Sequence, residues 1–266
     1  MTDHMRQANR RHWDAASEGW EGLRDQDQLW RVCIEEPSVA FVGDALQMIG
    51  ECCGDLGGQR VCVVGSGDNY AAFALAGMGA RVTSTDISTR QLQAAARRAA
   101  ILGLDIEFVR CDAVGLDPLA DSAYDLVCST NGFWVWIDEP HRVFCAVSRV
   151  LKPGGHYVMY DVHPFQRPWR DQTAIEMVKP YWATGPFVQA EKGRRTYEFH
   201  WTLADIVNSL LEAGLVLRRV AESGAKDSRF WEGPTYAPGT DDSLLDWRTN
   251  PRAGLPSWLT LAAQRP

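Results

Sequence analysis

The fold is decided by the stretch Arg60-Val-Cys-Val-Val-Gly-Ser-Gly-Asp-Asn-Tyr70. Its apolar run, residues 61–64, has no alternation, which is typical of a parallel strand covered on both faces. Gly65 and Gly67 then allow a tight turn and the close approach of a ligand, and a helix is expected from about Asn69. The pattern predicts a strand, a glycine turn and a helix N-terminus that together hold a nucleoside-containing cofactor.

The residues that follow this turn narrow the choice of cofactor. Asp86 ends the next expected strand and is placed to accept hydrogen bonds from ribose hydroxyls. A dinucleotide fingerprint, G-x-G-x-x-G, would have glycine at position 70, where this chain has Tyr70. The sequence therefore disfavours NAD.

Further elements are expected along the chain from their end signals. Ser88-Thr-Arg-Gln91 is a capping-box pattern that begins a helix ending at Gly103. Thr202-x-x-Asp205 begins another helix in the same way. Further strands are expected at residues 106–109, 124–129, 156–161, 215–221 and 258–262.

The string Arg149-Val-Leu-Lys-Pro-Gly-Gly155, between a helix and a strand, carries the most specific resemblance. The other matching positions are Gly65, Gly67, Asp86, Asp112 and Tyr124-Asp-Leu-Val127. In order and spacing, residues 60–161 resemble the class I S-adenosylmethionine-dependent methyltransferases of the small-molecule type. The third glycine of that family's G-x-G-x-G turn is Asn69 here, and asparagine tolerates unusual backbone angles.

The resemblance implies an α/β, Rossmann-like fold. Its seven-stranded sheet would be mostly parallel, with an antiparallel strand seven between strands five and six and helices on both faces. The chain is then expected to be one methyltransferase domain, residues 1–266. Within it we expect a cofactor-binding core at 51–165, a substrate-capping insertion at 166–201 and the rest of the core at 202–266, with a long loop at 222–255. Residues 1–50 form either a helix pair packed on the sheet edge or a lid over the site.

The resemblance also implies S-adenosyl-L-methionine as the cofactor and assigns positions to its site. Those positions are Gly65, Ser66, Gly67, Asn69, Asp86, Ile87, Cys111, Asp112, Ala113, Thr130 and Asn131. Asp112 would contact the adenine amino group, although an aspartate in that place can also cap a turn. The expected acceptor-binding residues are Trp13, Phe133, Trp134, Arg167, Trp169, Tyr181, Trp182 and Tyr197.

Three residues are candidates for a catalytic role. Methyl transfer is a direct displacement, so a base is needed only if the acceptor must lose a proton. Asp161 and His163 would share a face if strand five continued through them, and His200 lies at the end of the aromatic insertion. For both histidines the alternative is a hydrogen-bonded loop residue.

Composition limits the partners. A net charge of −7 argues against a nucleic-acid surface, and no stretch approaches a membrane span or a signal peptide, so a cytoplasmic protein without nucleic-acid or membrane partners is expected. Seven cysteines without zinc-site spacing are expected to be structural thiols, and no metal is expected.

These observations favour a small organic acceptor. The aromatic insertion suggests an apolar or ring-bearing molecule, and its arginines would either bind an anionic group or form a solvated basic face. Two alternatives stay open: an RNA methyltransferase, and an S-adenosylmethionine-binding protein or cyclase without methyl transfer.

Overall fold

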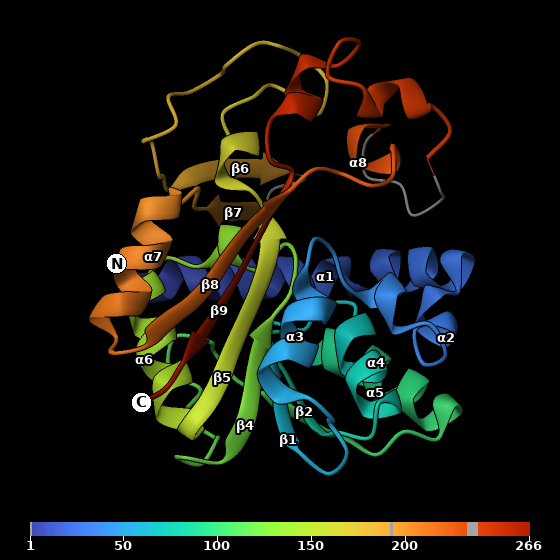
Figure 1. The fold of residues 1–266 in the computed structure, drawn as a ribbon, viewed down its shortest axis with the longest axis vertical. Helices are drawn as coiled ribbons and strands as arrows, with labels where there is room; N and C mark the ends of the chain where they lie inside the picture. Colours follow the sequence, from blue (N-terminus) through green and yellow to red (C-terminus); the bar gives the residue numbers. More distant parts are fainter. Residues whose placement is uncertain (1, 192–193, 233–238) are drawn as a thin grey trace.

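A seven-stranded sheet with the order β3-β2-β1-β4-β5-β9-β8 forms the centre of the structure (Figure 1). The computed structural model describes residues 2–191, 194–232 and 239–266. The strands are β1 (Arg60–Val64), β2 (Arg81–Asp86), β3 (Ile106–Arg110), β4 (Tyr124–Ser129), β5 (Leu151–Val162), β8 (Val216–Ser223) and β9 (Trp258–Gln264). β9 is antiparallel to both β5 and β8, whereas the pairs from β3 to β5 are parallel. The predicted fold class and the place of the last strand are confirmed.

Alternate residues of the strands enter two separate hydrophobic cores. Val61 and Val63 of β1 face one core, while Cys62 of the same strand faces the other. The first core is covered by α3 (Ala45–Cys53), α4 (Tyr70–Gly77) and α5 (Thr89–Leu102), and the second by α6 (Pro140–Val150) and α7 (Leu203–Glu212). Helices therefore lie on both faces, as predicted.

The predicted helix ends are confirmed in detail. Ser88 accepts a hydrogen bond from the Gln91 amide over 3.2 Å, and Gly103 ends the helix in the left-handed region at φ 67°. Thr202 and Asp205 form the full reciprocal capping box of α7. Local side-chain chemistry thus sets where these helices begin and end.

The N-terminal region contains α1 (Thr2–Asp27), α2 (Leu29–Val32) and η1 (Pro37–Ala40) before α3. Figure 1 shows α1 as one long helix crossing the molecule beside the sheet. Polar bonds hold α1 to the core: Arg24 donates to Asp68 over 2.8 Å, and the Tyr70 hydroxyl donates to Asp27 over 2.8 Å. Because Tyr70 stands at the first position of α4, it joins the end of α1 directly to the β1–α4 turn.

The insertion carries a two-stranded antiparallel hairpin of β6 (Phe187–Glu191) and β7 (Arg194–Glu198). The sequence Glu191-Lys-Gly193-Arg194 predicts a hairpin turn between two short strands, and its residues 192 and 193 lie outside the described residues. Asn9 of α1 exchanges two hydrogen bonds of 2.9 Å with the backbone of Tyr197 in β7. The insertion and α1 therefore pack together.

The stretch expected as a long loop, 222–255, is more ordered than the sequence suggested. β8 continues to Ser223, and α8 (Arg229–Glu232), η4 (Asp242–Leu245) and η5 (Pro251–Gly254) follow; residues 233–238 lie outside the described part. Trp231 and Arg252 are buried, and Arg252 donates to the side chain of Gln166 over 2.6 Å. The buried ring and the paired guanidinium hold this stretch against the insertion, so the long connection between β8 and β9 carries short helices and buried side chains.

Within the described ranges, no helix is long and apolar enough to cross a membrane.

The Tyr70 bond gives a first prediction. Tyr70→Phe should lower the free energy of unfolding by about 1.5–3 kcal/mol, because a buried hydroxyl donates to a carboxylate. Hydrogen exchange of residues 2–27 should become faster. Tyr124→Phe, which removes a buried hydroxyl bond to Thr83 far from α1, is the control and should leave exchange in α1 unchanged. Equal protection of α1 in both variants would contradict the role given to Tyr70.

Candidate functional site

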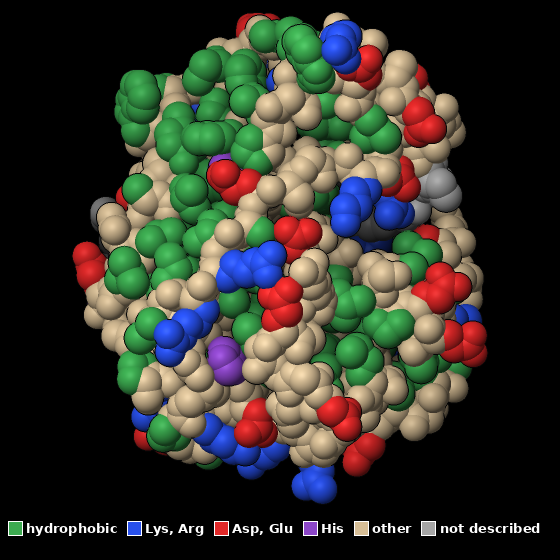
Figure 2. All heavy atoms as spheres, in the orientation of Figure 1, with side chains coloured by type: hydrophobic (Ala, Val, Ile, Leu, Met, Phe, Trp, Pro, Cys, Tyr) green, Lys and Arg blue, Asp and Glu red, His purple; other side chains and the backbone are tan. Residues whose placement is uncertain are grey.

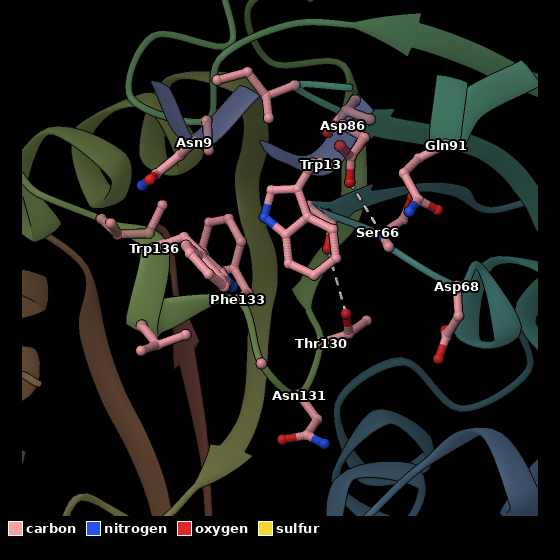
Figure 3. Close-up of a pocket in the computed structure, with 18 of the residues that line it drawn as sticks. Asn9, Trp13, Ser66, Asp68, Asp86, Gln91, Thr130, Asn131, Phe133 and Trp136 are labelled. Atoms are coloured by element: carbon pink, nitrogen blue, oxygen red, sulfur yellow. Dashed lines mark hydrogen bonds between the residues drawn. The ribbon is translucent and has the colours of Figure 1, made fainter. Parts of the chain in front are cut away.

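A cavity of about 590 Å³ lies at the carboxyl ends of the strands, beneath α1 (Figure 3). β1 and β4 are neighbours in the sheet. From β1 the chain continues to β2 on one side, and from β4 it continues to β5 on the other side. Open α/β sheets bind ligands at such a switch point. The cavity volume is typical of small-molecule sites.

The β1–α4 turn forms one wall of the cavity and has three left-handed residues. Gly65, Gly67 and Asn69 have φ values of 59°, 51° and 66°. A Cβ on Gly65 would stand 2.2 Å from the Phe133 ring, so no larger residue fits there. A Cβ on Gly67 would meet nothing closer than 4.0 Å, which leaves this backbone open to a ligand.

Asn69 stabilises the turn through its side chain as well as its backbone. Its amide oxygen accepts a hydrogen bond from Ser66 over 2.8 Å, and its amide nitrogen donates to the Gly67 carbonyl over 2.9 Å. Ser84 of β2 also donates to the Asn69 oxygen. All three side chains are buried, so the two bonds to the Asn69 oxygen are protected from water, and the bond to the Gly67 carbonyl is partly buried. Asparagine therefore supplies here a network that glycine could not.

Asp86 lies at the end of β2 against this turn. Its carboxylate accepts hydrogen bonds from the Gly67 amide over 3.1 Å and the Ser88 amide over 2.8 Å. Burial raises the pKa of Asp86, and the two backbone hydrogen bonds oppose that rise. The side chain lines the cavity, where its oxygens can accept further hydrogen bonds from a ligand.

The β3 end supplies the next part of the wall. Asp112 accepts from the Val114 amide over 3.0 Å, so it caps a turn, and it also lines the cavity. Arg6 of α1 lies 3.9 Å from Asp112 and donates to Asp138 over 2.9 Å. Burial raises the pKa of Cys111 to about 11, which keeps this thiol protonated near neutral pH.

Aromatic and apolar side chains line the other end of the cavity. Trp13 of α1 contacts Trp136 edge-on, with ring centroids 5.2 Å apart. In Figure 3 the Trp13 indole lies between Phe133 and Trp136 on one side and Ser66 and Asp86 on the other. The indole thus stands at the boundary between the β1–α4 turn and the apolar end.

Two charged side chains from the insertion region reach this apolar end. Arg167 and Glu198 both line the cavity. His200 lies behind Glu198, with its Nε2 3.4 Å from a Glu198 oxygen and its ring against Phe187. Burial lowers the pKa of His200, and the positive charge of Arg167 lowers it further. The hydrogen bond with Glu198 acts in the opposite direction and raises this pKa.

Residues 62–159 match the family described as Methyltransferase domain. Residues 62–159 are a methyltransferase domain, and the chain has the fold of S-adenosylmethionine-dependent methyltransferases.

Two curated proteins have sequences similar to that of the methyltransferase domain. The chain is similar to the demethylmenaquinone methyltransferase of Renibacterium salmoninarum, with 32% identity over 125 residues, 47% of this chain and 50% of that protein. It is similar to the phthiotriol/phenolphthiotriol dimycocerosates methyltransferase of Mycobacterium tuberculosis, with 34% identity over 116 residues, 41% of this chain and 40% of that protein. The chain spans half or less of the length of these curated relatives.

A solved structure shows the same fold. The S-adenosylmethionine-dependent methyltransferase from Mesorhizobium loti aligns with a TM-score of 0.61 at 22% identity, covering 84% of this chain and 98% of that chain.

The cofactor of this family is S-adenosylmethionine, and the cavity residues fit it. The open backbone at Gly67 and the carboxylate of Asp86 face the space that a nucleoside would occupy. All eleven residues expected around the cofactor line the cavity: Gly65, Ser66, Gly67, Asn69, Asp86, Ile87, Cys111, Asp112, Ala113, Thr130 and Asn131. The structure therefore brings the whole predicted set together at one wall of the methyltransferase domain.

The expected acceptor-binding residues divide into two groups. Trp13, Phe133 and Arg167 line the cavity. Trp134, Trp169, Tyr181, Trp182 and Tyr197 lie outside its lining. The sequence predicted that the insertion is rich in aromatic residues, but it did not predict which aromatic side chains line the cavity.

Each of the five outlying rings has another environment. Trp134 stacks on Phe144 in the core at 4.8 Å, and the Tyr181 hydroxyl accepts from the Leu203 amide over 2.8 Å. Trp169 donates to the Phe165 carbonyl, Tyr197 lies against His4 of α1, and Trp182 is 77% exposed. Four of the five rings thus pack against other parts of the protein outside the cavity lining, and Trp182 is exposed to solvent.

Asp161 holds the loop after β4. Its carboxylate accepts hydrogen bonds from the amides of Gly132, Trp134 and Val162, over 2.7 to 3.0 Å, and lies 3.6 Å from Arg167. Burial raises the pKa of Asp161, although Arg167 and the three amides oppose this. The side chain is outside the main cavity lining, so it positions the loop rather than facing an acceptor.

β5 ends at Val162, so the strand does not continue through both Asp161 and His163 as the shared face would require. The imidazole is fully buried: Nδ1 accepts from the Phe165 amide over 3.1 Å, and Nε2 lies 2.8 Å from Glu222. Both ring nitrogens are bound within the protein, away from the cavity lining. This placement does not fit the expected role as a base.

Sequence reasoning missed several residues of the cavity. Glu198, two residues before His200, was not predicted to belong to the site. The lining residues Arg6, Asn9, Trp136 and Val162 were not predicted either. The helical spacing of Arg6, Asn9 and Trp13 was the available signal, because residues three and four apart share a face. In the described part of the chain, no group of three or more His, Cys, Asp or Glu side chains could hold a metal ion.

The second prediction concerns His163 and pH. Burial lowers the pKa of His163 below its ordinary 6.5, so the unfolded chain binds the proton first as the pH falls. Stability should therefore decline as the pH falls below 6.5. His163→Gln, which cannot titrate, should show less of this decline in chemical unfolding at a series of pH values.

Methyl-transfer activity and cofactor affinity should stay close to wild type in the same His163 variant. A loss of turnover by two or more orders of magnitude, with an unchanged unfolding curve, would instead restore the catalytic role.

Proposed function

We propose that this protein transfers a methyl group from S-adenosylmethionine to a small, apolar or ring-bearing organic acceptor. One observation carries the proposal: a single cavity joins the family's cofactor wall to an end lined by aromatic and aliphatic side chains. A cofactor and an acceptor bound there would be neighbours, which is the main requirement of a direct displacement.

In this proposal the cofactor lies along the β1–α4 turn. Asp86 accepts hydrogen bonds from the ribose, the open backbone at Gly67 faces the methionine portion, and residues 111–113 border the adenine. When bound, S-adenosylmethionine supplies an electrophilic methyl group on a sulfonium. The chain's own contribution is to hold it, exclude water with α1 and orient the acceptor.

The acceptor lies at the apolar end. Trp13, Val135, Trp136 and Val162 offer rings and aliphatic surface, which suits an apolar or aromatic molecule. Arg167 can meet a polar or anionic substituent on it. The two relatives named above methylate, by their names, a quinone precursor and a lipid, which agrees with such an acceptor.

Glu198 is the group we propose as the base for an acceptor that must lose a proton. Its carboxylate belongs to the apolar end and is 25% exposed, whereas His200 is 15% exposed and lies behind it. A proton would pass from an acceptor hydroxyl to a Glu198 oxygen as the acceptor oxygen bonds to the methyl carbon and the bond from that carbon to sulfur breaks, which would leave S-adenosylhomocysteine. His200 then acts as a positioning residue, because its Nε2 lies 3.4 Å from the Glu198 carboxylate.

An acceptor screen tests the function directly. Quinols, phenols, small amines and transfer RNA would be offered with S-adenosylmethionine, and release of S-adenosylhomocysteine would be recorded. Release with apolar ring compounds supports the proposal. Release with RNA alone, or tight cofactor binding with no release for any compound, would overturn it.

The third prediction concerns Asp86. Asp86→Ala should weaken S-adenosylmethionine binding by about 1.5–3 kcal/mol, because the ribose loses a charged acceptor. Titration calorimetry measures this, with the exposed Asp105→Ala as control. Unchanged affinity in a folded Asp86 variant would show that the ribose is held elsewhere.

The fourth prediction concerns Glu198. Glu198→Gln should lower turnover on a hydroxyl acceptor by about 10²–10⁴, with cofactor affinity unchanged. Raising the pH should recover part of the rate, because the acceptor then ionises without help. The exposed Glu212→Gln on α7 is the control. Full turnover in the Glu198 variant at neutral pH would remove the proposed base.

A further inference from the structure

The Trp13 indole stands at the border between the cofactor wall and the apolar end of the cavity. It lines the cavity from α1, and its ring meets Trp136 of the apolar end edge-on, with centroids 5.2 Å apart. In Figure 3 the indole lies between Trp136 on one side and Ser66 and Asp86 on the other. A large aromatic surface is therefore held where the two halves of the cavity meet.

The proposed displacement decides which cofactor atom belongs at this border. With the ribose at Asp86 and the methionine portion at the Gly67 backbone, an acceptor reaches the methyl carbon from the apolar end. The sulfur that carries the methyl group then lies at the border too, beside the Trp13 ring. This sulfur is positively charged, and the face of an aromatic ring attracts a cation.

The charged side chains of the cavity also favour a cation. Six carboxylates and four guanidiniums line it, so the lining is net negative. The lining carboxylates belong to Glu21, Asp68, Asp86, Asp112, Asp138 and Glu198. A negative lining attracts the sulfonium form of the cofactor more strongly than a neutral thioether.

Each of the four lining guanidiniums has a carboxylate partner. The pairs, with 2.8 to 3.6 Å between nitrogen and oxygen, are Arg6–Asp138, Arg24–Asp68, Arg98–Asp25 and Arg167–Asp161. Arg97, outside the lining, pairs with Glu21. Figure 2 shows similar pairing on the outer surface, where several Lys and Arg side chains lie beside Asp or Glu side chains. Asp86, Asp112 and Glu198 exceed these pairs and leave the cavity negative.

We propose that the Trp13 ring binds the sulfonium of S-adenosylmethionine by a cation–π contact and so favours the methyl donor over its neutral product. Tryptophan gives the strongest such contact among the aromatic side chains. Phe133 is the other ring at this border, but it packs edge-on against Trp134 at 5.3 Å and closes over Gly65. Trp13 is therefore the ring that we assign to the charge.

The contact depends on the charge of the sulfur, so it ends with the transfer. As the acceptor bonds to the methyl carbon, the bond from that carbon to sulfur breaks and its electron pair stays on the sulfur, which becomes neutral. The Trp13 ring then has no cation to attract, and this part of the binding is lost for S-adenosylhomocysteine. The inference deepens the proposed function and rests on it, because the place of the sulfur follows from the proposed acceptor end.

Titration calorimetry with S-adenosylmethionine and S-adenosylhomocysteine tests the contact. Trp13→Leu should reduce the preference for the methyl donor, expressed as the ratio of the two affinities, by about 2- to 30-fold. Trp13→Phe keeps a ring that attracts a cation less strongly, so its ratio should lie between those of wild type and Trp13→Leu. Sinefungin, which carries an ammonium group where the methyl group stands, should lose affinity as S-adenosylmethionine does.

Trp20→Leu is the matched control. Trp20 also lines the cavity from α1, two helical turns beyond Trp13, but its ring already lies under the Arg24 guanidinium at 5.1 Å. This variant should keep the wild-type ratio of affinities. Thermal melting should show that all three variants are folded.

The outcomes separate this inference from the proposed function. Equal loss of affinity for the two compounds in both Trp13 variants, or a change in ratio as large in Trp20→Leu, would overturn the inference, because the ring would then be only an apolar wall. Wild type that binds neither compound would overturn the inference and the proposed function together. The expected ratios, without S-adenosylhomocysteine release for any acceptor, would support the inference and overturn methyl transfer alone.

Discussion

The buried hydrogen bonds of Asn69 fix the backbone on which the rest of the site depends. They hold a turn of three left-handed residues, and that turn sets the positions of Gly67, Asp86 and the Phe133 ring against Gly65. Because the network joins β1, α4 and β2, it ties the cavity wall to the centre of the sheet. A family turn that usually relies on glycine for its conformational freedom is stabilised here by a side chain.

The remaining walls are attached to this turn by polar contacts from distant parts of the chain. Arg24 and Tyr70 connect α1 to the β1–α4 region, and Asn9 connects α1 to β7. The cavity is consequently closed by elements from the beginning, the core and the insertion of the chain. This arrangement places an apolar end beside the cofactor wall, which is what alignment of a small acceptor with a methyl donor requires.

The core was predictable because its signals are local. The glycine turn and the caps at Ser88 and Thr202 each specify structure within a few residues, whereas β5 begins at Leu151, five residues before the expected start of that strand. The inward or outward direction of insertion side chains was not predictable, because it depends on partners far away in the sequence. His163 illustrates this: its partner is Glu222, on β8, and no pattern near residue 163 points to it.

The central claim is that one cavity, closed by α1, holds the cofactor beside the acceptor. Hydrogen exchange of the full chain with and without S-adenosylhomocysteine tests it most directly. The account predicts slower exchange at residues 65–70 and 86–88 and, in the same experiment, along residues 6–24 of α1. Protection of the turn with no change in α1, or no protection of the turn at all, would contradict it.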